Sequence, residues 1–162
     1  MTAPVWRSAT FAELDAPTLY ALLKLRVDVF VAEQADPYPD LDGRDLEPDA
    51  VHLWATIAGH PIAYVRVLRE SEGVARIGRV VIADDARGSG LGTELMTRAL
   101  EQVGDRRCVL SAQAHQAGFY VRFGFEVSGP PTTGRIPHVP MIRPEHYGSA
   151  ATRSSTASRR PV

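Results

Sequence analysis

The sequence contains a single cysteine, Cys108, among its 162 residues. One thiol cannot form a disulfide within the chain, and it cannot build a cysteine-based zinc site. Stabilisation by an internal disulfide or by a cysteine-based zinc site is therefore excluded. A lone cysteine also fits a reducing compartment, so we expect a cytoplasmic protein.

Long apolar runs and an excess of charge are lacking as well. No stretch approaches the roughly 18 consecutive apolar residues of a membrane-spanning helix, and the first ten residues do not resemble a secretory leader. The formal net charge is only −1, so the overall field favours neither nucleic acid nor an anionic membrane. We expect no partner of either kind.

Length and composition predict one globular domain followed by a tail. A chain of 162 residues with 44 % hydrophobic and 23 % charged residues is typical of a single folded domain. Residues 148–162 are small and polar, with three arginines and no apolar period. Such a segment cannot bury enough apolar surface to offset its ordering entropy. We therefore expect a folded domain over 1–147 and a disordered basic tail over 148–162.

Helical and strand patterns alternate along the domain, which predicts an α/β layout. Asp15 and Pro17 mark the start of the first helix, and three strand patterns in its middle predict an antiparallel meander. The expected helices cover residues 15–31, 91–103 and 114–123. The expected strands cover residues 5–8, 51–57, 62–68, 75–83, 108–112, 125–128 and 138–142.

The segment after the first helix is rich in proline and carboxylate. Residues 33–49 hold three prolines and seven carboxylates against one arginine, so we expect an exposed acidic loop. It is either simply solvated or attracts a cationic acceptor such as a polyamine, a basic peptide or an aminoglycoside. A calcium loop is excluded, because Asp45 and Val51 stand where an EF-hand requires glycine and glutamate.

Three glycines in five positions follow Arg87, where the strand over 75–83 leads into the helix over 91–103. Glycines at a helix start let backbone N–H groups converge, the helix dipole adds positive charge, and an arginine supports a pyrophosphate. A GxGxxG site is excluded because Thr93 stands at the last glycine, and the GK[ST] of a P-loop is missing. A tight turn that uses glycine only for backbone freedom stays open.

This turn resembles the central motif of the GNAT superfamily of acetyl-CoA-dependent N-acetyltransferases, Q/R-x-x-G-x-G/A, which Arg87, Gly90 and Gly92 fill. The segment FYVRFGF over residues 119–125 is similar to a second motif of that superfamily. A closer resemblance, to the ElaA-type branch, extends to Arg143. It rests on LYALLKLRVDVFVAEQADPYPDLDGRDLE, IGRVVIADDARGSGLG, SAQAHQAGFYVRFGF and IPHVPM.

Two positions depart from the general superfamily pattern. Gln113 stands where asparagine is usual. The ElaA-type pattern resembles this chain in having glutamine there, and we keep Gln113 among the cofactor-binding residues. Asp84 stands where proline is common after the strand, which leaves the splay of that strand open.

The resemblance implies a GNAT-like mixed, mostly antiparallel sheet with helices on both faces. It implies acetyl-CoA as cosubstrate, no metal, and direct attack of a primary amine in a ternary complex. The pantetheine arm would bond to the backbone of Val80, Val81 and Ile82, where an N–H would also stabilise the oxyanion. The pyrophosphate would bind the N–H groups of Gly88, Ser89, Gly90, Leu91, Gly92 and Thr93.

An acid and a base complete the predicted site. Tyr120 matches the tyrosine that protonates the departing thiolate, although an aromatic at helical spacing can also simply pack. His52 and His138 are the candidate bases, each also readable as a structural histidine, and Glu33 is a third candidate. The remaining histidines, which are weaker candidates, are His115, His60 and His146.

The sequence thus predicts an acetyl-CoA-dependent N-acetyltransferase acting on a small-molecule or peptide amine, with a homodimer allowed. The alternative from another class is a non-catalytic acyl-CoA-binding sensor or scaffold, which would keep the glycine turn but perform no transfer.

Overall fold

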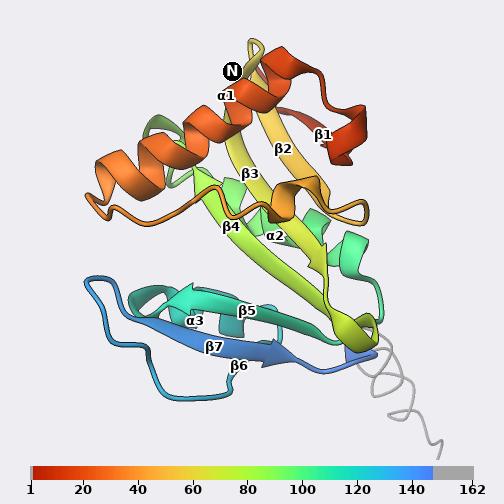
Figure 1. The fold of residues 1–162 in the computed structure, drawn as a ribbon, viewed down its shortest axis with the longest axis vertical. Coiled ribbons are helices and arrows are strands. Elements are labelled where there is room, and N and C mark those ends of the chain that lie inside the picture. Colours follow the sequence, from red (N-terminus) through yellow and green to blue (C-terminus); the bar gives the residue numbers. More distant parts are fainter. Residues whose placement is uncertain (1, 148–162) are drawn as a thin grey trace, which may run out of the picture. The chain divides into compact units, whose positions relative to one another are not determined.

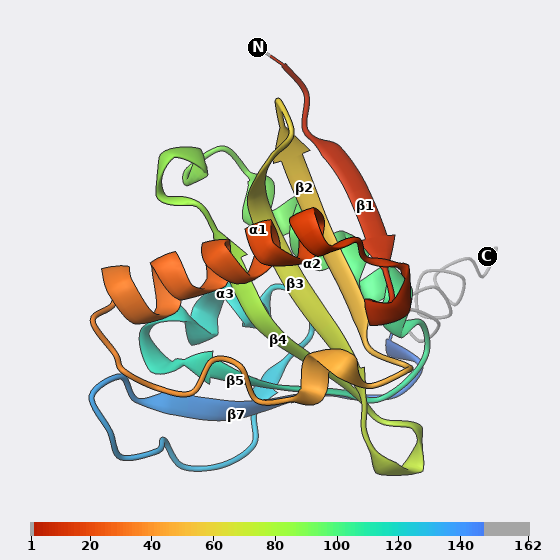
Figure 2. The same ribbon diagram turned by 45° about the horizontal axis from the view of Figure 1, so that its top comes forward.

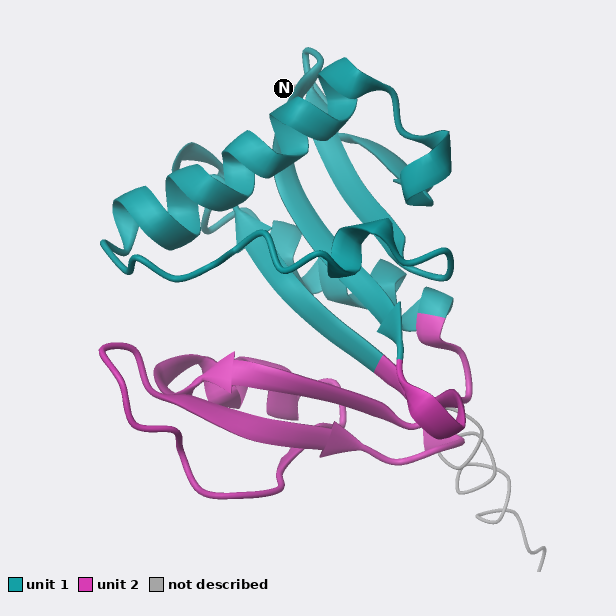
Figure 3. Cartoon of the chain, viewed as in Figure 1, with its two compact units in different colours: residues 1–69, 76–102 teal, residues 70–75, 103–162 magenta. Residues whose placement is uncertain are grey.

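The computed structural model describes residues 2–147, and it divides into two compact units (Figure 3). Unit 1 contains the chain up to residue 69 together with residues 76–102. Unit 2 contains residues 70–75 and the chain from residue 103 onward. The tail expected over 148–162 lies outside the described residues.

Unit 1 is built on a sheet whose strands follow the chain in order. They are β1 (Val5–Ala9), β2 (Val51–Ile57), β3 (His60–Arg69) and β4 (Ala75–Ile82). β1 pairs with β2 and β2 with β3, both antiparallel, with Trp54 opposite Tyr64. The β2–β3 hairpin turns at Ala58 and Gly59, both at positive φ, which is the backbone that a two-residue hairpin loop favours.

Two long helices cover the two faces of this sheet (Figures 1 and 2). Helix α1 (Ala16–Val27) begins where the Asp15 carboxylate accepts the Thr18 N–H at 2.8 Å, as the sequence predicts. It continues as a π-helical segment, Asp28–Glu33, which ends near Gln34. Helix α2 (Leu91–Val103) lies on the opposite face. The expectation of helices on both faces is confirmed.

One apolar cluster of unit 1 lies between α1 and the sheet. Three apolar side chains of α1 and its π-helical extension pack on three from the strands, and all six are buried. They are Leu22, Leu25, Val29, Trp54, Tyr64 and Val81. Burial of each such side chain contributes about 1.5–3 kcal/mol, which fixes α1 across the sheet.

Unit 2 has three strands in the order β5–β7–β6, with both pairs antiparallel. They are β5 (Cys108–Gln113), β6 (Glu126–Val127) and β7 (His138–Arg143). The helix expected over 114–123 is shorter than its pattern. A 3-10 turn, Ala114–Gln116, precedes helix α3 (Ala117–Val121), and Gly124 at φ 91° ends the turn that follows.

The segment between α1 and β2 is only in part the exposed acidic loop expected from its composition. Asp40 and Asp45 are only 4 % and 5 % exposed, and the segment runs along the α1 face of the sheet (Figures 1 and 2). The prediction is wrong for Asp40 and Asp45, because buried arginines of unit 1 neutralise these two carboxylates. Arg26 and Arg66, on α1 and β3, are 1 % and 3 % exposed.

Candidate active site

The glycine turn lies at the end of β4, where it opens helix α2. Gly88 and Gly90 have φ of 81° and 78°, which is left-handed backbone that glycine adopts readily. The Glu94 N–H donates to the Gly90 carbonyl at 3.3 Å, so helix hydrogen bonding starts at that residue. The N–H groups of residues 91–93 therefore precede the first donor of the helix ladder and can donate to an anion.

Ser89 uses its side chain inside the turn. Its hydroxyl donates to the Ala86 carbonyl at 2.7 Å, so the side chain braces the turn. Any contribution of Ser89 to an anion comes from its backbone N–H.

The Arg87 guanidinium lies against three carbonyl or carboxylate groups of unit 1. It forms a two-pronged ion pair with Glu33, with Nη2 at 2.9 Å from Oε2, and Nη1 is 3.2 Å from Asp84 Oδ1. Its Nε donates to the Ile82 carbonyl at 3.2 Å. The hydrogen bond between Arg87 and Glu33 raises the pKa of Arg87 and lowers the pKa of Glu33. Glu33, the third candidate base, is thus a paired carboxylate of reduced basicity.

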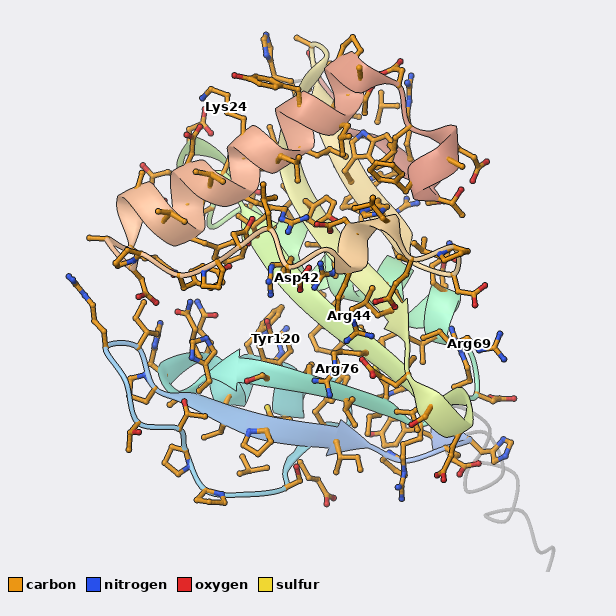
Figure 4. The ribbon with its side chains drawn as sticks, viewed as in Figure 1. Lys24, Asp42, Arg44, Arg69, Arg76 and Tyr120 are labelled. Carbon is orange, nitrogen blue, oxygen red and sulfur yellow. The ribbon has the colours of Figure 1, made fainter. Side chains whose placement is uncertain are left out.

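Three arginines and three aspartates form a charge-balanced cluster, which we call the Asp–Arg network. Its members are Arg26, Asp40, Asp42, Asp45, Arg66 and Arg79. Asp42, labelled in Figure 4, lies 2.9 Å from Arg66 Nη2 and 3.2 Å from Arg79 Nη2. Burial opposes the ionisation of Asp45, but hydrogen bonds from Arg26 and Arg66 outweigh it and lower the pKa of Asp45. These three aspartates therefore have no charge left over to attract a cation.

His52 lies in the core of unit 1 beside this network. It is 2 % exposed, with Nδ1 at 2.7 Å from the Tyr64 hydroxyl and Nε2 at 3.0 Å from the Asp45 carbonyl. A carbonyl can only accept, so Nε2 carries the proton and Nδ1 accepts from Tyr64. Burial lowers the pKa of His52. Both ring nitrogens are occupied, so this candidate base has no lone pair to offer an amine.

His138 in unit 2 has a different environment. It starts β7, opposite Gln113 of β5, and is partly buried. Its Nδ1 is 2.7 Å from the Ile136 carbonyl, which fixes the ring proton on Nδ1. The lone pair of the neutral ring is then on Nε2. The structure brings together Gln113 and His138, two of the predicted site residues.

Tyr120, labelled in Figure 4, projects from α3 in unit 2. It is 6 % exposed and forms edge-on ring contacts with Phe119 and Phe125 at centroid distances of 5.2 and 6.4 Å. No hydrogen bond joins its hydroxyl to another residue within 2–147. Burial raises the pKa of Tyr120 to about 12, so the phenol keeps its proton at neutral pH.

Within residues 2–147 no group of three histidine, cysteine, aspartate or glutamate side chains is placed to hold a metal ion. Within the same range no helix is long and apolar enough to cross a membrane. The cytoplasmic location and the homodimer stay predictions.

Sequence reasoning missed the arginines that neutralise the loop. Arg66 stands inside the apolar run of β3, and Arg26 stands on the inner side of α1 between Leu22, Leu25 and Val29. A charged residue in such a position is buried only when it is paired. That pattern, set beside a nearby run of aspartates, was the available indication of the Asp–Arg network.

Comparison with known proteins gives consistent results. Residues 21–143 match the model of an acetyltransferase (GNAT) domain. A UPF0039 protein of Mycobacterium tuberculosis H37Rv is 47 % identical over 137 residues, covering 82 % of this chain and 88 % of its own. Protein ElaA of Escherichia coli K12 is 39 % identical over 145 residues, covering 85 % and 95 %.

Solved structures agree with the sequence comparison. A crystal structure of an acyl-CoA N-acyltransferase from Pseudomonas aeruginosa matches with a TM-score of 0.83 at 43 % identity, covering 87 % of this chain and 99 % of that one. The crystal structure of Escherichia coli ElaA matches with the same TM-score at 37 % identity and the same coverage. The expected fold class, a GNAT-like mixed and mostly antiparallel sheet with helices, is confirmed.

Proposed function

Since the chain belongs to the GNAT acetyltransferase family and is an acyltransferase enzyme, we propose that it transfers the acetyl group of acetyl-CoA to a primary amine. The two substrates bind together, and the amine attacks the thioester directly. The non-catalytic sensor, our alternative from the sequence, is not carried further because the family is enzymatic.

The observation that carries this proposal is the glycine turn of unit 1. Left-handed backbone at Gly88 and Gly90 and the unbonded N–H groups at the start of α2 form a concave set of donors. The Arg87 guanidinium lies at the same turn and is 40 % exposed, so a diphosphate can reach it. These are the features that binding of the coenzyme A pyrophosphate requires.

The adjoining part of β4 is our proposed site for the rest of acetyl-CoA. The backbone of Val80, Val81 and Ile82 would bond to the amide groups of the pantetheine arm in the manner of a strand. A backbone N–H at Val81 or Ile82 would stabilise the oxyanion that forms when the amine adds to the thioester carbonyl.

Two side chains of unit 2 are proposed to move the protons. The attacking nitrogen forms a C–N bond and becomes cationic, and His138 Nε2, which holds the lone pair, accepts the proton it releases. Breaking the C–S bond generates the coenzyme A thiolate, and Tyr120 supplies its proton. A phenol with a pKa of about 12 arrives at that step protonated. Gln113, opposite His138, is proposed to contact acetyl-CoA.

The acceptor is proposed to be a primary amine without a required second charge. The argument for a cationic acceptor rested on an exposed acidic loop, and Asp40, Asp42 and Asp45 are paired with arginine. Pairing of these three aspartates weakens that support, so an acceptor screen should contain neutral and cationic amines in equal number.

Titration calorimetry with acetyl-CoA tests the proposal, with ATP and NADH as competitors for the same turn. Arg87→Ala should weaken acetyl-CoA binding about tenfold. That is the low end for a lost charged hydrogen bond, because wild-type Arg87 must give up Glu33 to bind phosphate. Arg98→Ala is the matched control, since Arg98 is also 40 % exposed and pairs with Glu94 at 3.1 Å. It should leave the affinity unchanged. Absence of acetyl-CoA binding to the wild type would overturn the proposal.

A further inference from the structure

The backbone of β4 contains an unusual residue just before its proposed cofactor-binding stretch. Arg79 has φ of 55°, a left-handed conformation that arginine rarely adopts and that is foreign to a regular strand. The preceding residue, Gly78, is not at positive φ. The strand therefore places a long charged side chain at the position where glycine would adopt the backbone most easily.

The side chain of Arg79 is held by the loop that precedes β2. Its Nε is 2.9 Å from Asp40 Oδ1, and its Nη2 is 3.1 Å from the Asp40 carbonyl and 3.2 Å from Asp42 Oδ2. The guanidinium carbon lies 5.5 Å from the centre of the Tyr38 ring, which is a cation–π distance. The Tyr38 hydroxyl donates to Asp40 Oδ1 at 2.6 Å.

The loop that holds Arg79 is itself fixed to the rest of unit 1. Arg26 of α1 bonds to the Asp40 carboxylate and carbonyl, both at 3.0 Å. Arg66 of β3 binds Asp42 through two 2.9 Å hydrogen bonds. The carboxylates facing Arg79 are thus anchored by buried arginines, so the Arg79 guanidinium is held by a rigid support.

We propose that Arg79 is a positioning residue. Its contacts with Tyr38, Asp40 and Asp42, which we call the grip, hold the left-handed bend of β4 and thereby orient the backbone of residues 80–82 to bind acyl-CoA. The inference rests on the proposed function and adds to it a group that never touches the substrate. The bend reorients the N–H and C=O groups that follow it, and Val81, two residues after Arg79, is anchored in the core. Without the grip, the strand can relax to a regular extended form.

Arg79→Gly and Arg79→Ala separate the backbone from the side chain. Glycine adopts positive φ freely, so Arg79→Gly removes the grip without backbone strain, whereas Arg79→Ala removes the grip and keeps the strain. If Arg79 merely tolerated its conformation, Arg79→Gly would bind acetyl-CoA at least as well as the wild type. We expect both variants to lose at least tenfold in acetyl-CoA affinity.

Two further measurements distinguish positioning from general stability. The KM for acetyl-CoA should rise in Arg79→Gly while the KM for the amine acceptor stays unchanged. Arg79→Lys, which keeps the charge but not the fork, should recover part of the lost affinity. Arg98→Ala again serves as the control for removal of an ion-paired arginine from unit 1.

Hydrogen exchange of the unliganded proteins tests the grip without acetyl-CoA. Amides of residues 80–83 should exchange at least tenfold faster in Arg79→Gly than in the wild type, while those of α1 stay unchanged. If the wild type fails to bind acetyl-CoA, the proposed function falls, and the exchange result alone decides whether Arg79 holds the bend. Wild-type affinity of Arg79→Gly for acetyl-CoA, or unchanged exchange over 80–83, would overturn the inference.

Discussion

Replacing Arg26 by methionine should remove a large part of the stability of this protein. The Arg26 side chain is 1 % exposed and makes four hydrogen bonds, two to Asp40 and two to Asp45, at 2.7–3.3 Å. Methionine fills much of the volume of the arginine side chain, so the loss in free energy of unfolding measures mainly the removal of the charge. Removing one partner of a buried ion pair costs about 3–5 kcal/mol, because the other partner remains buried without compensation.

The structure places Arg26→Met near the lower end of that range. Asp40 keeps Arg79 and the Tyr38 hydroxyl, and Asp45 keeps Arg66 at 3.0 Å, so neither carboxylate is left without a partner. We therefore expect a loss of about 3 kcal/mol. Domains of this size have a total stability of about 5–15 kcal/mol, so the variant should still fold.

Urea unfolding of a double-mutant cycle measures the coupling directly. Asp45→Asn removes the opposite charge and keeps the shape of the side chain. Combined with Arg26→Met it restores the balance of the Asp–Arg network. The loss in the double variant should be smaller than the sum of the single losses by about 1–3 kcal/mol. Additivity within about 0.5 kcal/mol, or a loss below about 1 kcal/mol in Arg26→Met, would refute the reasoning.

Four other expectations follow from the described side chains. Gly90→Ala should lose about 1–2 kcal/mol of unfolding free energy, measured in urea, and bind acetyl-CoA less tightly, because alanine is strained at φ of 78°. Tyr120→Phe should reduce kcat about 100-fold or more in steady-state assays while calorimetry finds its acetyl-CoA affinity unchanged. His138→Gln should reduce kcat about 100-fold in steady-state assays, and a kcat equal to that of the wild type would exclude His138 as the base. Burial lowers the pKa of His52, so stability is fully present above about pH 6.5 and falls below it by up to about 1.4 kcal/mol per pH unit; His52→Asn should flatten that slope in thermal melts.

Local patterns predicted most of the elements because each depends on residues close in sequence. The Asp15 cap, the apolar face of α2 and strand β2 each appear where the sequence places them. Burial in β2 does not alternate, however, because residues 52–55 are all buried. Element ends were less accurate. The helix expected to reach residue 123 ends at Val121, and β6 contains only two residues.

Long-range pairing could not be predicted from local composition. The carboxylates of residues 40–45 belong with arginines 14 to 39 positions away in the chain, and composition alone assigned them to solvent. The role of His52 also depends on long-range contacts that the local sequence does not reveal. Its type suggested a base, and only its contacts with Tyr64 and the Asp45 carbonyl identify a neutral core residue. The left-handed Arg79 has no marker in the sequence, because nothing distinguishes it from an arginine in a regular strand.

Helix α1 connects through unit 1 to both ends of the β4 stretch that we assign to acetyl-CoA. At one end Arg26 holds Asp40, which holds Arg79. At the other end Glu33, the last residue of the π-helical segment, pairs with Arg87, whose Nε donates to the Ile82 carbonyl. Both connections come from the C-terminal end of α1 and the π-helical segment that continues it, so this part of the chain contacts both ends of residues 79–82.

The ion pairs of Arg26 and the Arg87–Glu33 ion pair differ in the free energy needed to break them. Arg26 is buried, so breaking its pairs leaves uncompensated charge. Arg87 and Glu33 are about 40 % exposed, and a pair of that kind is worth about 1 kcal/mol or less and is screened by salt. A diphosphate can thus take Arg87 from Glu33 at little cost, while Arg79 stays in place. Binding of acetyl-CoA should therefore reorganise the glycine-turn end of this stretch and leave the bend at Arg79 unchanged.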